Sequence, residues 1–202
     1  TLSNRNFFYY LSAYLTVWFG INTLTIAMPY VAEGLLGVSA DVSGYMIAGA
    51  FILALLFSPV VPIWSRKAGK KKVLIQSSLL FAAVLIATGS FGTVLPFPAA
   101  LAVTALSGIA LAAIFIVPNA MIADLVEADG VMRGERREAM FFGTQGLVIK
   151  IVIGLSSLFT PLVFRTFGFS ADEPLGLMLI GPISGAVVLI GVLLLARYDL
   201  TE

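Results

Sequence analysis

Hydrophobic residues run along the chain in long stretches, which are separated by short charged or Pro/Gly-rich segments. A stretch of about twenty apolar residues is long enough to cross the hydrocarbon core of a bilayer, roughly 30 Å thick, as an α-helix. Six stretches meet this requirement, at approximately residues 7–31, 44–64, 73–94, 97–125, 139–164 and 177–196. The pattern therefore predicts an all-α membrane protein whose single domain, residues 1–202, is a bundle of six transmembrane helices.

The composition agrees with a lipid environment. Of the 202 residues, 59% are hydrophobic and only 11% are charged, whereas charged residues make up about 25% of soluble domains. Polar side chains are too few to cover a compact, water-soluble particle of this size. The outer surface is therefore expected to face hydrocarbon.

The chain contains no Cys and no His. Disulfides, thiolate nucleophiles, imidazole bases and the usual zinc ligands are thereby removed, and no paired carboxylates lie at mid-depth in a predicted span. We therefore do not expect an enzyme, and we assign no catalytic residue, metal site or cofactor. No signal peptide precedes the first span, and the chain looks like one part of a larger protein.

Basic residues gather on one side of the predicted bundle. Ten of the 12 Lys and Arg lie before the first span, after the last one, or in the two connections at residues 65–72 and 133–137. Arg165 falls on the other side, and Lys150 falls inside a span. By the positive-inside rule, both chain ends are expected in the cytoplasm, with the protein in the plasma (bacterial inner) membrane.

The spans also divide into two triplets. The first span carries Pro29 followed by Glu33, and the fourth carries Pro118 followed by Asp124. Three-plus-three repeats of inverted topology are typical of each half of a major facilitator transporter. A Pro in a transmembrane helix often only produces a kink, however, so a purely structural interpretation stays open.

Lys150 lies deep in the fifth span. About eleven residues precede it in that span, which places it roughly 16 Å from the start of the helix, where a Lys costs about 2.5 to 3.5 kcal/mol on insertion scales. Gly143, Gly146, Gly154 and Ser157 fall within about 40° of it around the helix. Because no Asp or Glu lies at this depth in any span, an internal ion pair is disfavoured. Three neighbours remain possible for the Lys150 side chain: an aqueous cavity, an anionic or hydroxyl-rich ligand, or an acid on a missing partner.

Other candidates for contact with a ligand lie in the first, fourth and fifth spans. Asn22 and Gln145 carry amides that must be hydrogen-bonded in lipid surroundings. Trp18 and Phe115 offer ring faces for a sugar or an acyl chain. Helix packing is the alternative role for each of these residues.

Small residues at helix-contact spacing also occur in the sixth and fourth spans. Gly181 and Gly185 form such a pair, as do Gly108 and Ala112. Small side chains let two helices approach closely in a membrane. Since no polar group accompanies the pair in the sixth span, we predict that it serves packing alone.

Acids and bases alternate in the connection between the fourth and fifth spans. They are Asp124, Glu127, Asp129, Arg133, Glu135, Arg136, Arg137 and Glu138. Such charges at helix ends are typical of salt bridges that form and break in a conformational change, although solvated surface charge is the alternative. The candidates for this gating role are Asp124, Glu127, Arg133, Arg136 and Arg137.

Several of these segments resemble a known family. Residues 117–127 (VPNAMIADLVE), residues 134–143 (GERREAMFFG) and Lys150 resemble the helix 10 to helix 11 region of the glycoside-pentoside-hexuronide:cation symporter (melibiose permease-like) family of the major facilitator superfamily. Residues 4–8 (NRNFF) resemble the start of its helix 7, and residues 66–71 (RKAGKK) its turn between helices 8 and 9. The likeness covers nearly the whole chain.

The resemblance implies that the chain is the C-terminal half, helices 7 to 12, of a cation-coupled symporter for a sugar or another small organic solute. It places Lys150 and Gln145 at the substrate cavity, and it places Phe115 where melibiose permease has a Trp that stacks on sugar. The coupling cation, Na⁺ or H⁺, would be bound by the missing N-terminal half. That half, the lipid bilayer and a small-molecule substrate are the implied partners, and nucleic acid is not expected.

Two other functions stay open. Related branches of the family carry lysolipids, so the fold alone does not decide the substrate. A membrane scaffold or assembly module would instead bind a different membrane protein through its small-residue faces. A scaffold predicts a uniformly apolar outer surface, whereas transport predicts a side that is interrupted by Lys150, Gln145 and Asn22.

Overall fold

A computed structural model describes residues 5–133 and 138–198, with the backbone alone at 132–133. The described residues form helices joined by short links, without a strand. The helices are α1 (Arg5–Gly34), α2 (Asp41–Phe57), α3 (Val60–Ala68), α4 (Lys70–Thr88), α5 (Phe97–Arg133), α6 (Glu138–Phe167) and α7 (Leu175–Leu195). Of these, 5 are long and apolar enough to cross a membrane, and the count rises to 6 if the bent pair of α2 and α3 is taken as one span. The predicted all-α membrane fold is confirmed.

The second predicted span is divided between α2 and α3, which meet at a bend of 63°. Pro59 and Pro62 have no N–H, so the carbonyls of Leu55 and Ser58 lose their normal helical donors. The Ser58 N–H (3.3 Å) and hydroxyl (2.8 Å) both donate to the Leu55 carbonyl, and the Val61 N–H donates to the Ser58 carbonyl at 3.3 Å. The span therefore tightens into a turn where the sequence pattern predicted a continuous helix.

Two other helix ends differ from the predicted boundaries. The third span ends at Thr88, six residues before the predicted end. Gly92 follows with a φ of 75°, a conformation that only glycine adopts readily. The fourth span continues to Arg133, so Asp124 and Glu127 lie on a helix and not in a loop.

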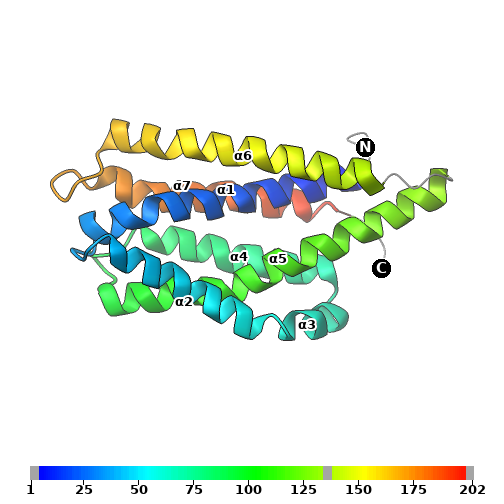
Figure 1. The fold of residues 1–202 in the computed structure, drawn as a ribbon, viewed down its shortest axis with the longest axis horizontal. Helices are drawn as coiled ribbons and strands as arrows, with labels where there is room; N and C mark the ends of the chain where they lie inside the picture. The colour runs from blue at the N-terminus through cyan, green and yellow to red at the C-terminus, as the bar shows by residue number, and fades with distance from the viewer. Residues whose placement is uncertain (1–4, 134–137, 199–202) are drawn as a thin grey trace.

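The packing of the helices has the symmetry of an internal repeat. With α2 and α3 counted as one span, the first three spans (α1, α2, α4) correspond to the last three (α5, α6, α7). The packed pair α1–α7 then corresponds to the packed pair α5–α4, and the packed pair α2–α5 corresponds to the packed pair α6–α1. The pair α4–α7 is its own counterpart. Since α1 and α5 start at opposite ends of the bundle (Figure 1), the two triplets are inverted, as in half of a major facilitator fold.

Glycines bring α4, α7 and their neighbours close together. A Cβ at Gly181 or Gly185 of α7 would overlap atoms of α4, including the Leu85 carbonyl in the first case. Gly108 of α5 approaches the backbone of α2 at Ala50 in the same way. The predicted packing role of these glycines is therefore confirmed.

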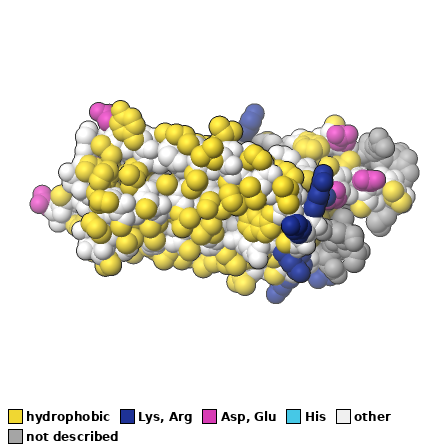
Figure 2. All heavy atoms as spheres, turned by 90° about the horizontal axis from the view of Figure 1, so that it is seen from below, with side chains coloured by type: hydrophobic (Ala, Val, Ile, Leu, Met, Phe, Trp, Pro, Cys, Tyr) yellow, Lys and Arg dark blue, Asp and Glu magenta, His cyan; other side chains and the backbone are white. Residues whose placement is uncertain are grey.

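Basic residues are concentrated at one end of the bundle. The start of α1, the end of α7 and the connections α3–α4 and α5–α6 all lie at this end (Figure 1). Figure 2 shows Lys and Arg gathered toward this end, while hydrophobic side chains cover the middle of the molecule. The described basic residues of this end are Arg5, Arg66, Lys67, Lys70, Lys71, Lys72 and Arg197. An apolar girdle with a basic end is the surface of an integral membrane protein.

Candidate functional site

One face of α1 carries a stripe of aromatic and polar side chains. Tyr10, Tyr14, Trp18 and Asn22 recur at every fourth position, so they lie on the same side of the helix. The ring centroids are 5.8 Å apart for Tyr10 and Tyr14, and 6.2 Å apart for Tyr14 and Trp18. Partners on α5 and α6 contact this stripe along its length, so it is the part of α1 on which a site between those helices would be built.

The structure brings Trp18 and Phe115 together, as a shared ligand site requires. Their ring centroids are 6.1 Å apart, and Phe115 stacks in turn on Phe51 of α2, with centroids 6.2 Å apart and an interplanar angle of 3°. Trp18 Nε1 is buried and has no hydrogen-bond partner among the described residues. Sequence reasoning missed Phe51, because an aromatic residue inside a continuous apolar run gives no distinguishing signal.

Asn22 joins α1 to α6. Its Nδ2 lies 2.6 Å from Ser156 Oγ, 3.3 Å from the Ile153 carbonyl and 3.4 Å from Ser157 Oγ. The amide group therefore finds acceptors inside the bundle, as a polar side chain in lipid surroundings must. Asn22 has a packing role in this arrangement, and its contact with a substrate stays a prediction.

Gln145 lies in a buried contact between α1, α5 and α6. Its side chain is 5% exposed, and the Tyr10 hydroxyl lies 3.2 Å from Gln145 Oε1 and 3.0 Å from the Pro118 carbonyl. One hydroxyl proton serves these two acceptors. The five residues from Gln145 to Lys150 turn the helix by about 140° between them, so the two side chains leave α6 in different directions. This geometry does not test the contact of Gln145 with substrate, which stays a prediction.

Lys150 lies on an open face of α6. It stands near the middle of this 30-residue helix, its side chain is exposed, and no hydrogen bond or ion pair holds it among the described residues. A Cβ at Gly143, Gly146 or Gly154 would meet no atom within 4 Å. In α6, 22% of the most apolar stretch is buried, against 44–56% in the other long helices. The small-residue face around Lys150 is therefore left uncovered by the other residues that the structure describes.

The charged end of the bundle contains an ion pair between α4 and α5. Lys70, the first residue of α4, pairs with Asp124 of α5, and both side chains are about one-third exposed. Lys71 Nζ donates to the carbonyls of Ala196, at 2.9 Å, and Tyr198 at the end of α7. Lysines at a helix N-terminus face the positive end of its dipole, and these acidic and carbonyl partners offset that repulsion.

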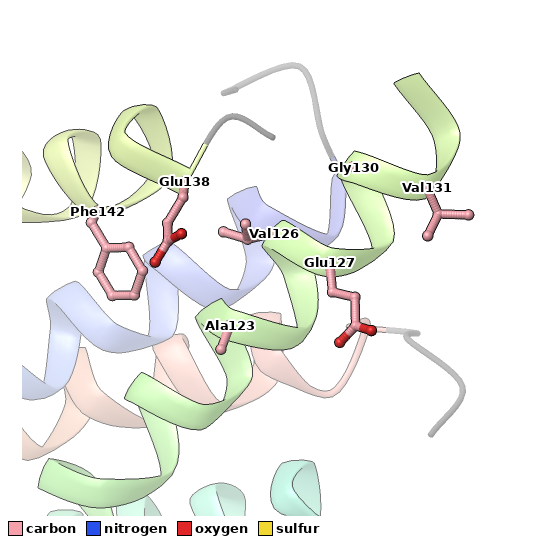
Figure 3. A pocket seen from close by; sticks show the side chains of 7 residues that line it. All are labelled: Ala123, Val126, Glu127, Gly130, Val131, Glu138 and Phe142. Atoms are coloured by element: carbon pink, nitrogen blue, oxygen red, sulfur yellow. The ribbon is translucent and has the colours of Figure 1, made fainter. Parts of the chain in front are cut away.

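A cavity of about 580 Å³ lies between the facing ends of α5 and α6 (Figure 3). It is lined by Ala123, Val126, Glu127, Gly130, Val131, Glu138 and Phe142. This described lining has two carboxylates and no basic side chain. Of the other predicted gating residues, Arg136 and Arg137 lie outside the described residues, as does the side chain of Arg133.

Comparison with known proteins decides the family. The family model described as MFS/sugar transport protein, where MFS denotes the major facilitator superfamily, matches residues 1–202. The chain belongs to this family. An uncharacterized symporter of Synechocystis sp. (strain ATCC 27184 / PCC 6803 / Kazusa) is 25% identical over 174 residues, which cover 85% of this chain and 31% of that protein. The chain thus matches less than a third of this relative's length, and no solved structure matches it.

Membership of the MFS sugar-transport family agrees with the geometry. It confirms the resemblance to a major facilitator transporter of the sugar type, and it points to an integral membrane protein of a transporter family rather than to an enzyme. The inverted pattern of helix packing is the one that this superfamily uses in each half.

Proposed function

We propose that this MFS chain is one half of a cation-coupled symporter that carries a sugar or another small organic solute by alternating access. The observation that carries the proposal is the open face of α6, where Lys150 is exposed near the middle of the helix among glycines at which an added Cβ would meet no atom within 4 Å. A lone ammonium group at this depth is costly against lipid. The face therefore requires a polar or aqueous covering, which the cavity between two transporter halves supplies.

An N-terminal half of six helices would form the other wall of that cavity. The matched symporter is long enough to hold such a half, since 31% of it is covered here. In Figure 1, α2 and α6 run along opposite sides of the bundle. Both helices carry exposed apolar side chains, such as Leu55 and Leu158, which suits contact with the other half or with lipid.

The proposed substrate face combines three kinds of group. Trp18 and Phe115 offer rings on which the apolar side of a sugar can pack. Lys150 offers an ammonium group that donates hydrogen bonds to hydroxyl or anionic oxygens. Asn22 and Gln145 complete the site from their positions at the contacts of α1 with α6. We place the coupling cation, Na⁺ or H⁺, in the N-terminal half.

The charged end would act as the cytoplasmic gate. We place both ends of the chain in the cytoplasm of a bacterial inner membrane because the basic residues gather there. The Lys70–Asp124 pair, with Glu127, Arg133, Arg136 and Arg137, would break and re-form as the halves rock. A scaffold is disfavoured, since its outer surface would not expose a Lys at mid-depth.

Uptake by the full-length protein in liposomes tests the proposal. Accumulation of a radiolabelled sugar is expected under an imposed Na⁺ or H⁺ gradient, and an ionophore that collapses the gradient should abolish it. A panel of neutral sugars, sugar acids and lysolipids separates the sugar symporter from the lysolipid carrier. Failure of every solute, with stable capture of a second membrane protein, would favour the scaffold.

Labelling of single cysteines tests the orientation. Lys67 and Asp172 are both exposed and lie at opposite ends of the bundle. In a Cys-free background, Lys67→Cys should react only after the cytoplasmic face is opened, and Asp172→Cys should react from outside. Reaction of both from the same side would contradict the topology.

A further inference from the structure

A small cavity lies inside the bundle between α1, α4 and α5. The centre of a water molecule could occupy a volume of about 10 Å³ within it. It is lined by Ala13, Tyr14, Val17, Leu74, Ser78, Ile114 and Pro118. One buried water requires roughly 10 to 15 Å³ and two or more polar partners, so the size of the cavity fits a single water.

Two polar groups at this cavity lack their ordinary partners. Ser78 is 1% exposed, and its hydroxyl has no hydrogen-bond partner among the described residues. Pro118 has no N–H, so it leaves the Ile114 carbonyl, one turn earlier in α5, without its helical donor. Buried hydroxyls and carbonyls are nearly always satisfied by protein or by ordered water. Ser78 and Ile114, the residues that carry this donor and this acceptor, both line the cavity.

Two other carbonyls near this proline already accept hydrogen bonds from side chains. The Tyr10 hydroxyl reaches the Pro118 carbonyl, and Asn119 Nδ2 donates to the Phe115 carbonyl at 2.9 Å. Within the described chain, no side chain donates to the Ile114 carbonyl. The Ile114 carbonyl is therefore the acceptor that remains for a water.

The bend between α2 and α3 shows how a freed carbonyl is satisfied directly. There Pro59 frees the Leu55 carbonyl, and the hydroxyl of Ser58 in the same segment donates to it at 2.8 Å. At Pro118 the nearby hydroxyl belongs to a different helix and makes no direct bond. A bridging molecule is the way to join the two groups.

We propose that one structural water occupies this cavity, accepting a hydrogen bond from the Ser78 hydroxyl and donating one to the Ile114 carbonyl. The water joins α4 to the segment of α5 around Pro118, which lies between Phe115 of the proposed substrate face and Asp124 of the ion pair. The proposal concerns the folded bundle itself and stands whether or not the protein transports a sugar.

Thermal unfolding of the purified full-length protein tests this water. Ser78→Ala removes one of its partners and should lower the melting temperature by a few degrees. The matched control is Ser77→Ala, because Ser77 is equally buried and has no partner among the described residues, yet does not line the cavity. Loss of an unsatisfied hydroxyl should leave the melting temperature unchanged or raise it. A Ser78→Ala variant that behaves like Ser77→Ala would overturn the proposal.

A second variant identifies the acceptor. Pro118→Ala restores a backbone N–H that can reach the Ile114 carbonyl, so Ser78→Ala should lower the melting temperature less in that background. An equal fall in melting temperature in both backgrounds would exclude this carbonyl as the acceptor.

A high-resolution density map of the unmodified protein tests the water independently of any variant. It should show a peak about 2.7 to 3.0 Å from both oxygens, and a map that resolves other buried waters but lacks this peak would contradict the assignment.

Discussion

Two helices of the bundle carry glycines at similar spacing and use them in opposite ways. On α7, a Cβ at Gly181 or Gly185 would overlap atoms of α4. On α6, a Cβ at Gly143, Gly146 or Gly154 would meet nothing within 4 Å. A small-residue stripe therefore marks a helix contact in one place and an open face in the other. The feature that distinguishes them in the sequence is Lys150, because a charge accompanies only the open stripe.

The physical reason lies in what drives helix contact in a membrane. Lipid tails are as apolar as Leu, so helices associate through close packing, and glycine permits the closest approach. The helices α4 and α7 are packed in this way, and they are the corresponding helices of the two triplets. A Lys placed in such a contact would be buried without a partner. The stripe on α6 therefore needs a different neighbour, which we assign to the cavity and the other half.

The largest expected effect comes from filling the packed stripe. Gly181→Leu should reduce the stability of the protein by roughly 3 kcal/mol or more, because overpacking against rigid backbone is not relieved by rotamer changes. The obstructing atoms include the Leu85 carbonyl oxygen of α4. Denaturant unfolding in detergent measures the change.

The matched variant on α6 is Gly146→Leu. It should alter stability much less and should reduce uptake, since the added side chain enters the proposed cavity. If both glycine variants destabilise the full-length protein equally, the α6 face is packed in the assembled transporter, and the contrast between the two stripes is lost.

The all-α membrane fold could be predicted from the sequence because long apolar runs indicate membrane-spanning helices. Breaks inside helices could not, because they depend on where freed carbonyls find donors, as at Ser58 and Pro59. The stripe on α7 was correctly interpreted as packing. The contact between Tyr10 and Gln145 was not foreseen, since it pairs residues that are 135 positions apart, although the four-residue spacing of Tyr10, Tyr14 and Trp18 was visible in the sequence.

Removing the charge from the open stripe should have the next largest effect. If the ammonium of Lys150 contacts substrate, Lys150→Ala removes a charge-assisted hydrogen bond worth about 1.5 to 3 kcal/mol, which is roughly a ten- to hundred-fold loss of affinity. Folding should survive, because deleting a lone intramembrane charge relieves a cost. Substrate binding and thermal unfolding of the full-length protein are measured together, with Lys150→Met as the control for side-chain length.

The opposite result would also be informative. Normal substrate binding by both Lys150 variants, combined with unfolding several degrees earlier, would mean that Lys150 pairs with an acid in the other half. The open face of α6 would then be an interface between halves, and the cavity assignment would be wrong.

A smaller effect is expected at the buried contact between α1, α5 and α6. Tyr10→Phe removes the hydroxyl that donates to Gln145 and the Pro118 carbonyl, so stability should fall by about 1 to 2 kcal/mol. Substrate affinity should fall with it, because Gln145 of the proposed substrate site loses the partner that orients its amide. Unfolding and binding assays on the same preparation check this. A loss of stability at unchanged affinity would instead leave Gln145 with a packing role alone and contradict its place in the substrate site.

The smallest effect on stability belongs to the ion pair between Lys70 and Asp124. Both side chains are about one-third exposed, so solvent screens the pair. A double-mutant cycle of Lys70→Ala and Asp124→Ala should therefore give a coupling free energy of roughly 0.5 kcal/mol.

The effect of this ion pair on transport should be clearer than its effect on stability. If the pair forms and breaks in each cycle, either single variant slows uptake with little change in apparent affinity, and the reversed pair Lys70→Glu with Asp124→Lys partly restores the rate. Lys72→Ala is the control, because Lys72 lies in the same turn, is exposed and has no partner among the described residues. Should Lys72→Ala slow uptake as much as Lys70→Ala, the net charge of this end, and not the pair, governs the rate.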